Sequence, residues 1–312
     1  MSRIQTRRRF MLDSAALGVA ALAAPRFAPA GPTDVPVDMS IARWKPPAPS
    51  AALPDAMAAR LAEAAIVQLG GMSRFVRRGD VVWIKPNIGW NRKPEHAANT
   101  HPHVVAQLVR MCQEAGAKTV KVGDNPCNDP KQCYENSGIA PAARALGAEI
   151  VFLDRDRFRN MAIGGKRLKQ HPVYPELVEC DLVINVPVCK HHGETEVSLC
   201  MKNYMGVVED RGEFHQDLPA TITDLTRFMK PRLCVLDATR MLVANGPTGG
   251  RLDDVRPMFT VAAGTDIVAL DAFGCELLGH KPESISTVAA GRDAGLGRTD
   301  YRALSLKETE LS

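Results

Sequence analysis

The sequence predicts an α/β fold with a mainly parallel sheet flanked by helices. Short apolar runs rich in β-branched residues alternate along the chain with segments of helical periodicity, and this alternation is typical of parallel sheets. The chain has 312 residues, of which 45% are hydrophobic and 24% charged. Such a chain can bury a sizeable core, which excludes a disordered protein and a disulfide-dependent miniprotein. We therefore expect one elaborated α/β domain.

The first 30 residues predict an export signal. A basic start, with Arg7, Arg8 and Arg9, precedes an alanine-rich apolar stretch over 12–24 that is too short to cross a bilayer. The order TRRRFML resembles the twin-arginine export signal, and the small residues at 28–30 offer a cleavage site. That route carries folded proteins, typically with a cofactor inserted in the cytoplasm. We therefore expect a periplasmic protein and treat a buried cofactor as a hypothesis.

Removing this segment changes the charge. The whole chain carries a formal charge of +4, but five of its 39 basic residues and one of its 35 acidic residues lie within 1–30, which leaves 34 of each sign. A neutral mature chain gives no general support for binding nucleic acid, so we expect no nucleic-acid partner. No later stretch approaches the roughly 18 apolar residues of a membrane span, so we expect no transmembrane segment after signal removal.

The remaining elements follow in chain order. Residues 31–54 are rich in Pro, Ala and Ser, which predicts an extended or loosely attached arm, and the single α/β domain then covers 55–312. A helix is expected over 56–69. Apolar β-rich runs predict strands over 81–85, 118–122, 149–153, 181–186, 232–236 and 258–262.

Capping and turn residues predict three more features. Thr100 can cap the helix that follows the first of these strands, and Pro102 suits its first turn. Residues 161–168 predict a small β-hairpin whose two central glycines suit a tight turn. Asp266 is expected to cap a later helix, within which Asp271 lies among apolar neighbours, so its carboxylate must be either paired or functional.

Polar side chains follow several of the predicted strands. Open α/β sheets bind ligands beyond the carboxyl ends of their strands, so these residues are the candidates for substrate binding and proton transfer. The sequence lacks the P-loop, Rossmann, nucleophile-elbow, HExxH and paired CxxC motifs. The absence of these motifs excludes the common nucleotide, hydrolase and zinc sites, and the amines, amides and imidazoles that follow the strands favour an anionic or carbonyl small-molecule substrate. The candidates are Lys85, Asn87, Asp124, Lys190, His191 and Lys202.

The eight cysteines divide by context. Four lie in or beside apolar elements and are interpreted as structural, namely Cys112, Cys180, Cys234 and Cys275. The other four, Cys127, Cys133, Cys189 and Cys200, lie in polar segments. Four thiolates are the usual ligands of a four-iron cluster, although the spacing matches no ferredoxin run. A Cys127–Cys133 disulfide, free thiols, or a single metal bound by cysteine and histidine are the alternatives.

Several segments together resemble a known family. They include VVWIKPNIGWNRKPEHAANTHPHVV, AGAKTVKVGDN, DLVINVPVCKHHGETEVSLCMKNYMGVV and DIVALDAFGCELLG. Over residues 80–298 the chain resembles the bacterial and archaeal family catalogued as domain of unknown function three-six-two, in its exported twin-arginine subgroup. Members of that family look like α/β proteins, some are fused to ferredoxin-type four-iron modules, and many are described as iron–sulfur-binding. The resemblance therefore implies an iron–sulfur cofactor.

The family motifs match this chain position by position. The matches are Lys85-Pro86-Asn87, Thr100-His101-Pro102, Gly123-Asp124 and Lys202-Asn203. The cysteines of the exported subgroup match Cys127, Cys133 and Cys200, whereas many members lack a cysteine at the position of Cys189. The fourth ligand is therefore Cys189, a histidine or an external group.

Two hypotheses follow. The first is an exported iron–sulfur protein, an oxidoreductase or electron carrier, whose 4Fe-4S cluster is held by the four cysteines and which uses an unidentified redox partner or small-molecule substrate. The second is a periplasmic binding or scaffold protein with a Cys127–Cys133 disulfide and no cluster. Neither hypothesis specifies the reaction or the oligomeric state.

Overall fold

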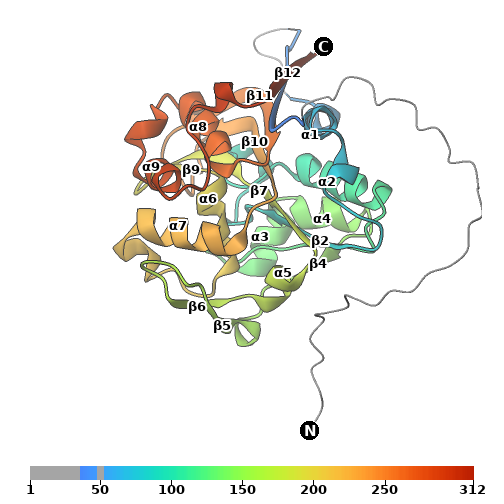
Figure 1. The fold of residues 1–312 in the computed structure, drawn as a ribbon. Coiled ribbons are helices and arrows are strands. Elements are labelled where there is room, and N and C mark those ends of the chain that lie inside the picture. Colours follow the sequence, from blue (N-terminus) through green and yellow to red (C-terminus); the bar gives the residue numbers. More distant parts are fainter. Residues whose placement is uncertain (1–35, 48–52) are drawn as a thin grey trace, which may run out of the picture. The chain divides into compact units, whose positions relative to one another are not determined.

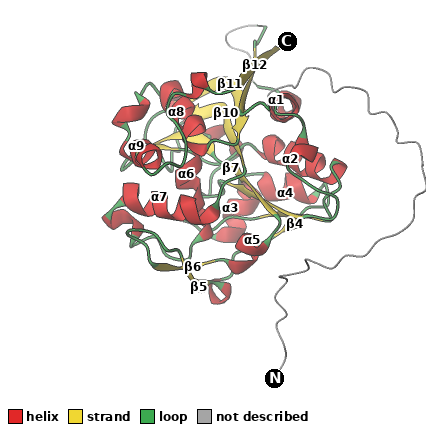
Figure 2. Cartoon of the chain, in the orientation of Figure 1, coloured by secondary structure: helices red, strands yellow, loops and turns green. Residues whose placement is uncertain are grey.

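The computed structural model describes residues 36–47 and 53–312, and the predicted signal segment lies outside these ranges. The described residues form a ten-stranded sheet and a separate two-stranded sheet, with helices around the larger one (Figure 1). Figure 2 shows the same arrangement by type of element. The predicted α/β class is confirmed. No helix of the described part of the chain is long and apolar enough to cross a membrane.

The large sheet has the order β12-β1-β11-β10-β7-β2-β3-β4, with β8 paired to β10 and β9. The central strands β10, β7, β2, β3 and β4 pair in parallel, so their carboxyl ends meet at one edge. The strands are β1 (Met39–Trp44), β2 (Val81–Pro86), β3 (Thr119–Val122), β4 (Glu149–Ile150), β7 (Leu182–Val186), β8 (Val188–His192), β9 (Glu196–Ser198), β10 (Leu233–Leu242), β11 (Val255–Gly264) and β12 (Leu306–Leu311).

Helices cover both faces of this sheet. The helices are α1 (Asp55–Gln68), α2 (Pro102–Glu114), α3 (Pro130–Asn136), α4 (Ile139–Arg144), α5 (Pro175–Glu179), α6 (Cys200–Asn203), α7 (Leu218–Met229), α8 (Ile267–Leu277) and α9 (Ser286–Asp293). One apolar core contains residues of α1–α4 and the other contains residues of α5–α9 (Figure 1). In β2, Trp83 belongs to the second core and its neighbour Ile84 to the first, since side chains alternate along a strand.

Part of the predicted arm is a strand of the sheet. Residues 39–44 form β1, which pairs antiparallel with β11 and parallel with β12. Met39 and Ile41 are buried in one core while Ala42 and Trp44 are buried in the other. The flanking prolines and alanines dominate the composition of 31–54, so the sequence analysis did not separate this six-residue strand from its surroundings.

The predicted hairpin and the predicted cap of α2 both differ in detail from the structure. The hairpin is present as β5 (Arg159–Ala162) and β6 (Gln170–Val173), but residues 166–168 lie in its loop. Their backbone amides donate to the Asp224 carboxylate over 2.7–3.0 Å instead of to a partner strand. The cap of α2 is His101, whose Nδ1 accepts from the His103 amide at 3.2 Å. The Thr100 hydroxyl instead donates to the Val186 carbonyl at 2.6 Å.

Candidate functional site

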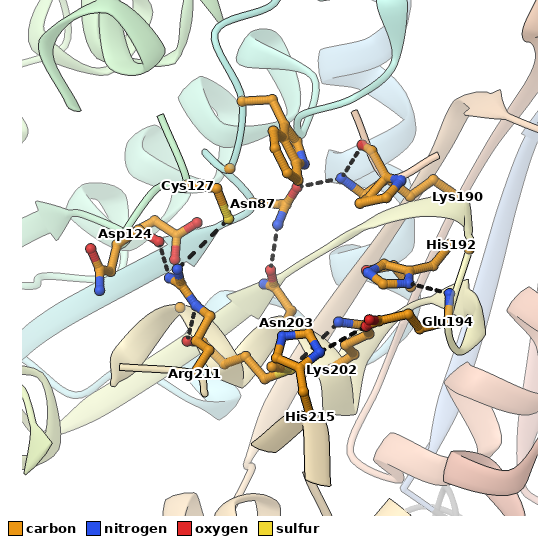
Figure 3. A pocket seen from close by; sticks show the side chains of 18 residues that line it. Asn87, Asp124, Cys127, Lys190, His192, Glu194, Lys202, Asn203, Arg211 and His215 are labelled. Atoms are coloured by element: carbon orange, nitrogen blue, oxygen red, sulfur yellow. Dashed lines mark hydrogen bonds and ion pairs between the residues drawn. The ribbon is translucent and has the colours of Figure 1, made fainter. Parts of the chain in front are cut away.

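A pocket of about 410 Å³ lies beyond the carboxyl ends of β2, β3 and β7 (Figure 3). Its position agrees with the general rule for open α/β sheets. It brings together Asn87, Asp124, Cys127, Lys190 and Lys202, which the sequence singles out, and Lys85 lies in contact with Asp124 just behind the lining. Other residues that line the pocket are His192, Glu194, Asn203, Met205, Gly206, Arg211, His215 and Pro247.

Lys85, Asp124 and Asn203 form what we call the pocket floor. Lys85 Nζ lies 2.6 Å from Asp124 Oδ1, and both side chains are buried. Lys85 Nζ also donates to Asn203 Oδ1 at 3.1 Å, and the Ile88 amide donates to Asp124 Oδ2 at 2.7 Å. Burial lowers the pKa of Lys85, while the neighbouring Asp124 carboxylate opposes that shift. The floor is thus a satisfied network of buried charges.

Gly206 makes this close packing feasible. A Cβ atom placed there would overlap the Asp124 carboxylate and lie 2.6 Å from Lys85 Nζ. The backbone at Gly206 also accepts a hydrogen bond from the Asn125 amide at 3.0 Å, so the segment cannot move away without losing a contact. Gly206, the glycine in CMKNYMG, is therefore required because the backbone lies too close to the Lys85–Asp124 ion pair for any side chain to fit.

Lys190 is a buried cation that has no carboxylate partner within residues 36–47 and 53–312. Its Nζ donates to the Ala98 carbonyl at 2.6 Å, to Asn87 Oδ1 at 3.0 Å and to the Pro247 carbonyl at 3.2 Å. Three neutral oxygens therefore take its three protons. Burial lowers the pKa of Lys190 to about 7, and the positive charge of Lys202 adds to the effect.

Lys202, Arg211 and Cys127 form what we call the pocket mouth. Lys202 Nζ has a single polar contact among the described residues, the Met205 thioether sulfur at 3.5 Å, which is a weak acceptor. Burial lowers the pKa of Lys202 to about 8. Arg211 donates from Nε to the Met205 carbonyl at 3.0 Å, from Nη1 to the Cys127 sulfur at 3.7 Å, and from Nη2 to the Asn125 carbonyl.

Two histidines and a glutamate line another side of the pocket (Figure 3). His192 Nδ1 accepts from the Glu194 amide at 3.1 Å, and burial lowers the pKa of His192 to about 3, so its ring is neutral at physiological pH. The Glu194 carboxylate lies 2.8 Å from His215 Nδ1. Glu194 therefore already has a partner within the protein.

His191 does not line the pocket, although the sequence analysis names it as a candidate. Residues 188–192 form β8, a strand beyond the one predicted over 181–186, so Lys190 and His192 share one face of the strand and His191 lies on the other. His191 Nδ1 accepts from the Gly246 amide at 3.1 Å. This contact holds the chain next to Pro247, whose carbonyl in turn binds Lys190.

The structure does not bring the four candidate cysteine ligands together. Cys133 belongs to the core on one face of the sheet, whereas Cys189 and Cys200 belong to the core on the other, and Cys127 is exposed at the pocket mouth. Cys189 sulfur lies 3.7 Å from the Gly274 carbonyl. Over residues 36–47 and 53–312, no three His, Cys, Asp or Glu side chains are grouped as metal ligands. These cysteines therefore do not fit a four-iron cluster.

All eight thiols are free, so Cys127 and Cys133 are not bonded to each other. Burial raises the pKa of Cys133 to about 11, and it also raises the pKa values of Cys189 and Cys200. Protonated, buried thiols of this kind behave as small apolar groups. Among the four, Cys127 is the one that reaches the pocket.

Asp271 is paired rather than part of the pocket. Its carboxylate accepts from the Cys200 amide at 2.6 Å and from the Met201 amide at 3.1 Å, and so it fixes the start of α6, which carries Lys202 and Asn203. The expected cap of α8 is confirmed, since Asp266 accepts from the Ala269 amide at 2.9 Å. Sequence reasoning missed Arg211, because nothing in its local sequence places it beside Cys127.

Comparisons with known proteins agree with the resemblance seen in the sequence. The chain is 31% identical over 241 residues to the thylakoid-associated protein sll1697 of Synechocystis sp., which covers 74% of this chain and 73% of that protein. It is also similar to the lactate racemase apoprotein from Thermoanaerobacterium thermosaccharolyticum, with 12% identity and a TM-score of 0.46. That match covers 72% of this chain, which spans 58% of the solved chain. Residues 82–276 match the family model described as "Domain of unknown function (DUF362)", and the chain belongs to this family.

Proposed function

We propose that the pocket binds a small organic anion that carries a carbonyl or carboxyl group, and that its lysines support proton transfer on that ligand. The observation that carries the proposal is the excess of positive charge. Lys190, Lys202 and Arg211 line the pocket without a salt bridge to any described carboxylate. The acidic residues there, Asp124 and Glu194, face Lys85 and His215. A concave site with uncompensated cations attracts an anion.

The amine chemistry supports proton transfer near neutral pH. Burial lowers the pKa of Lys190 to about 7 and that of Lys202 to about 8, so either amine can exchange a proton under physiological conditions. A general acid or base is most effective when its pKa lies near the working pH. Lys202 is the better placed of the two, because its Nζ is not held by oxygen acceptors.

Thermal denaturation with a panel of carboxylates and their neutral amides tests this function. A ligand that binds only the folded state raises the melting temperature by an amount that grows with the ratio of its concentration to its dissociation constant. We expect mono- or dicarboxylates of short chain length to stabilise the wild type, and the matched amides not to do so. Stabilisation of Lys202→Met by the same acids, equal to that of the wild type, would contradict the proposed role of the mouth. So would a panel in which no acid stabilises the wild type.

The exported iron–sulfur role is a separate proposal that rests on the sequence. Its support is the twin-arginine-like start and the family resemblance, whereas the four cysteines lie apart in the structure and supply no ligand set. An assay of iron and acid-labile sulfide in anaerobically purified protein tests the cluster. Replacing Arg7 and Arg8 by lysine, followed by cell fractionation, tests the export route; unchanged periplasmic recovery would rule out twin-arginine export.

A further inference from the structure

Lys202 differs from the other two pocket lysines in how its amine is held. Lys85 contacts the Asp124 carboxylate, Asn203 Oδ1 and the Pro86 carbonyl, and Lys190 donates to three oxygens. Within the part of the chain that the structure describes, the only polar contact of the Lys202 amine is the Met205 sulfur at 3.5 Å. An ammonium has three protons to donate. An amine that lies at a pocket and is not held by oxygen acceptors is free to bind a ligand.

The backbone that carries Lys202 is nevertheless firmly fixed. The Asp271 carboxylate holds the amides of Cys200 and Met201, just before Lys202. The next residue, Asn203, belongs to the pocket floor, where its Nδ2 donates to Asn185 Oδ1 at 2.8 Å and to the Lys85 carbonyl at 3.2 Å. A loosely held amine on a rigid backbone is the arrangement expected of a reactive group rather than of a structural one.

We propose that Lys202 forms a Schiff base with the carbonyl carbon of a short-chain 2-oxo acid bound in the pocket. The inference rests on the proposed function, since it requires an organic anion to occupy this site. It adds a covalent step and a substrate class that anion binding alone does not demand. Lys190 is not suited to this step, because all three of its protons are taken by oxygens.

The step needs no oxidant or reductant. The lone pair of the neutral Lys202 amine attacks the carbonyl carbon, the π electrons of the C=O bond move to oxygen, and a proton passes from nitrogen to that oxygen to give a carbinolamine. The hydroxyl then leaves with a proton from solvent as water, and a protonated C=N bond remains. Burial favours the neutral amine, since it lowers the pKa of Lys202 to about 8.

Arg211 is placed to hold the carboxylate of the same molecule. A guanidinium has five N–H donors, and three of them go to the Met205 carbonyl, the Cys127 sulfur and the Asn125 carbonyl. Two donors are left for a ligand, and a guanidinium matches the geometry of a carboxylate. A 2-oxo acid has its carboxylate next to its carbonyl, so one small molecule can address both side chains.

Borohydride trapping on the full-length protein tests the inference. The protein is incubated with pyruvate or with 2-oxoglutarate, reduced with sodium borohydride, and analysed by intact mass and peptide mapping. We expect one reduced adduct per chain, located on Lys202. Propanoate, which has the carboxylate but lacks the ketone at C2, gives no adduct. Lys202→Arg, which keeps the positive charge but lacks a nucleophilic amine, loses the adduct. Lys166→Arg, on the loop outside the pocket, retains it.

The outcomes separate this inference from the proposed function. If the 2-oxo acids raise the melting temperature of the wild type but leave no adduct on Lys202, the Schiff base is wrong and anion binding stands. If neither the 2-oxo acids nor any other acid of the carboxylate panel stabilises the protein, and no adduct forms, both proposals fail. Labelling that persists in Lys202→Arg also overturns the inference, since another lysine then reacts.

Discussion

The pocket floor and the pocket mouth place similar side chains in opposite circumstances. At the floor, Lys85 is buried against Asp124 and each charge meets a partner within the protein. At the mouth, the one polar contact of Lys202 among the described residues is a thioether sulfur, and two N–H donors of Arg211 remain available. The role of each lysine therefore follows from the groups around its amine. The paired lysine of the floor stabilises the fold, whereas the lysine of the mouth is available to a ligand.

The largest expected effect comes from breaking the floor. Lys85→Met leaves the Asp124 carboxylate buried without its cation, which should lower the free energy of unfolding by about 3–5 kcal/mol. Urea denaturation followed by circular dichroism measures this change. The matched double variant Lys85→Met/Asp124→Leu removes both charges and should recover much of the loss. A single variant as stable as the wild type would show that the ion pair does not matter to the floor.

Gly206→Ala should have the next largest effect. The added methyl group collides with the Asp124 carboxylate and crowds Lys85 Nζ, so the floor must shift, at a cost of about 1–3 kcal/mol. The same denaturation experiment measures the cost. Gly193→Ala serves as the control, because Gly193, like Gly206, lacks a positive φ, and the nearest atom to its Cβ position lies 3.8 Å away. Equal losses in both variants would refute the crowding at the floor.

His101, at the start of α2, links stability to pH. Burial lowers its pKa to about 2 from the usual 6.5, so the folded protein keeps the ring neutral while the unfolded chain binds a proton below pH 6.5. With respect to His101, the free energy of unfolding is therefore highest above pH 6.5, and it decreases as the pH is lowered from 6.5 toward 2. Its slope is at most about 1.4 kcal/mol per pH unit. His101→Asn keeps a capping acceptor but does not titrate, and its stability should fall less steeply on acidification than that of the wild type.

At the mouth we expect almost no effect on stability. Lys202→Met removes an amine whose one polar contact, as far as the chain is described, is the Met205 sulfur, so the free energy of unfolding should stay within about 0.5 kcal/mol of the wild type. Chemical denaturation of the unliganded protein provides the check, with Lys85→Met as the reference from the floor. A loss as large as that of Lys85→Met would erase the distinction between the two regions.

The sequence predicts the fold class and the positions of six strands, because hydrophobic periodicity reports directly on burial. Some strand ends differ, since β10 continues to Leu242 where the prediction stops at 236, and β4 stops at Ile150 where the prediction continues to 153. The sequence is less informative where contacts with distant parts of the chain determine the local structure. Whether residues 188–192 form a loop or a strand depends on β10, and only the strand separates His192 from His191 at the pocket. The contexts of Cys133 and Cys189 look polar in sequence, yet packing buries both thiols on opposite faces of the sheet. Arg211 reaches Cys127 across 84 residues, and no local pattern records that contact.

The proposed anion site at the mouth can be tested by calorimetric titration of the wild type and of Lys202→Met. Each protein is titrated with pyruvate and with its neutral analogue pyruvamide. If the mouth is an anion site, the wild type binds pyruvate more tightly than pyruvamide, and Lys202→Met loses most of that preference while it remains folded. Equal binding of the acid and the amide by the wild type, or an unchanged preference in Lys202→Met, would contradict the claim that the uncompensated charge at Lys202 selects the ligand.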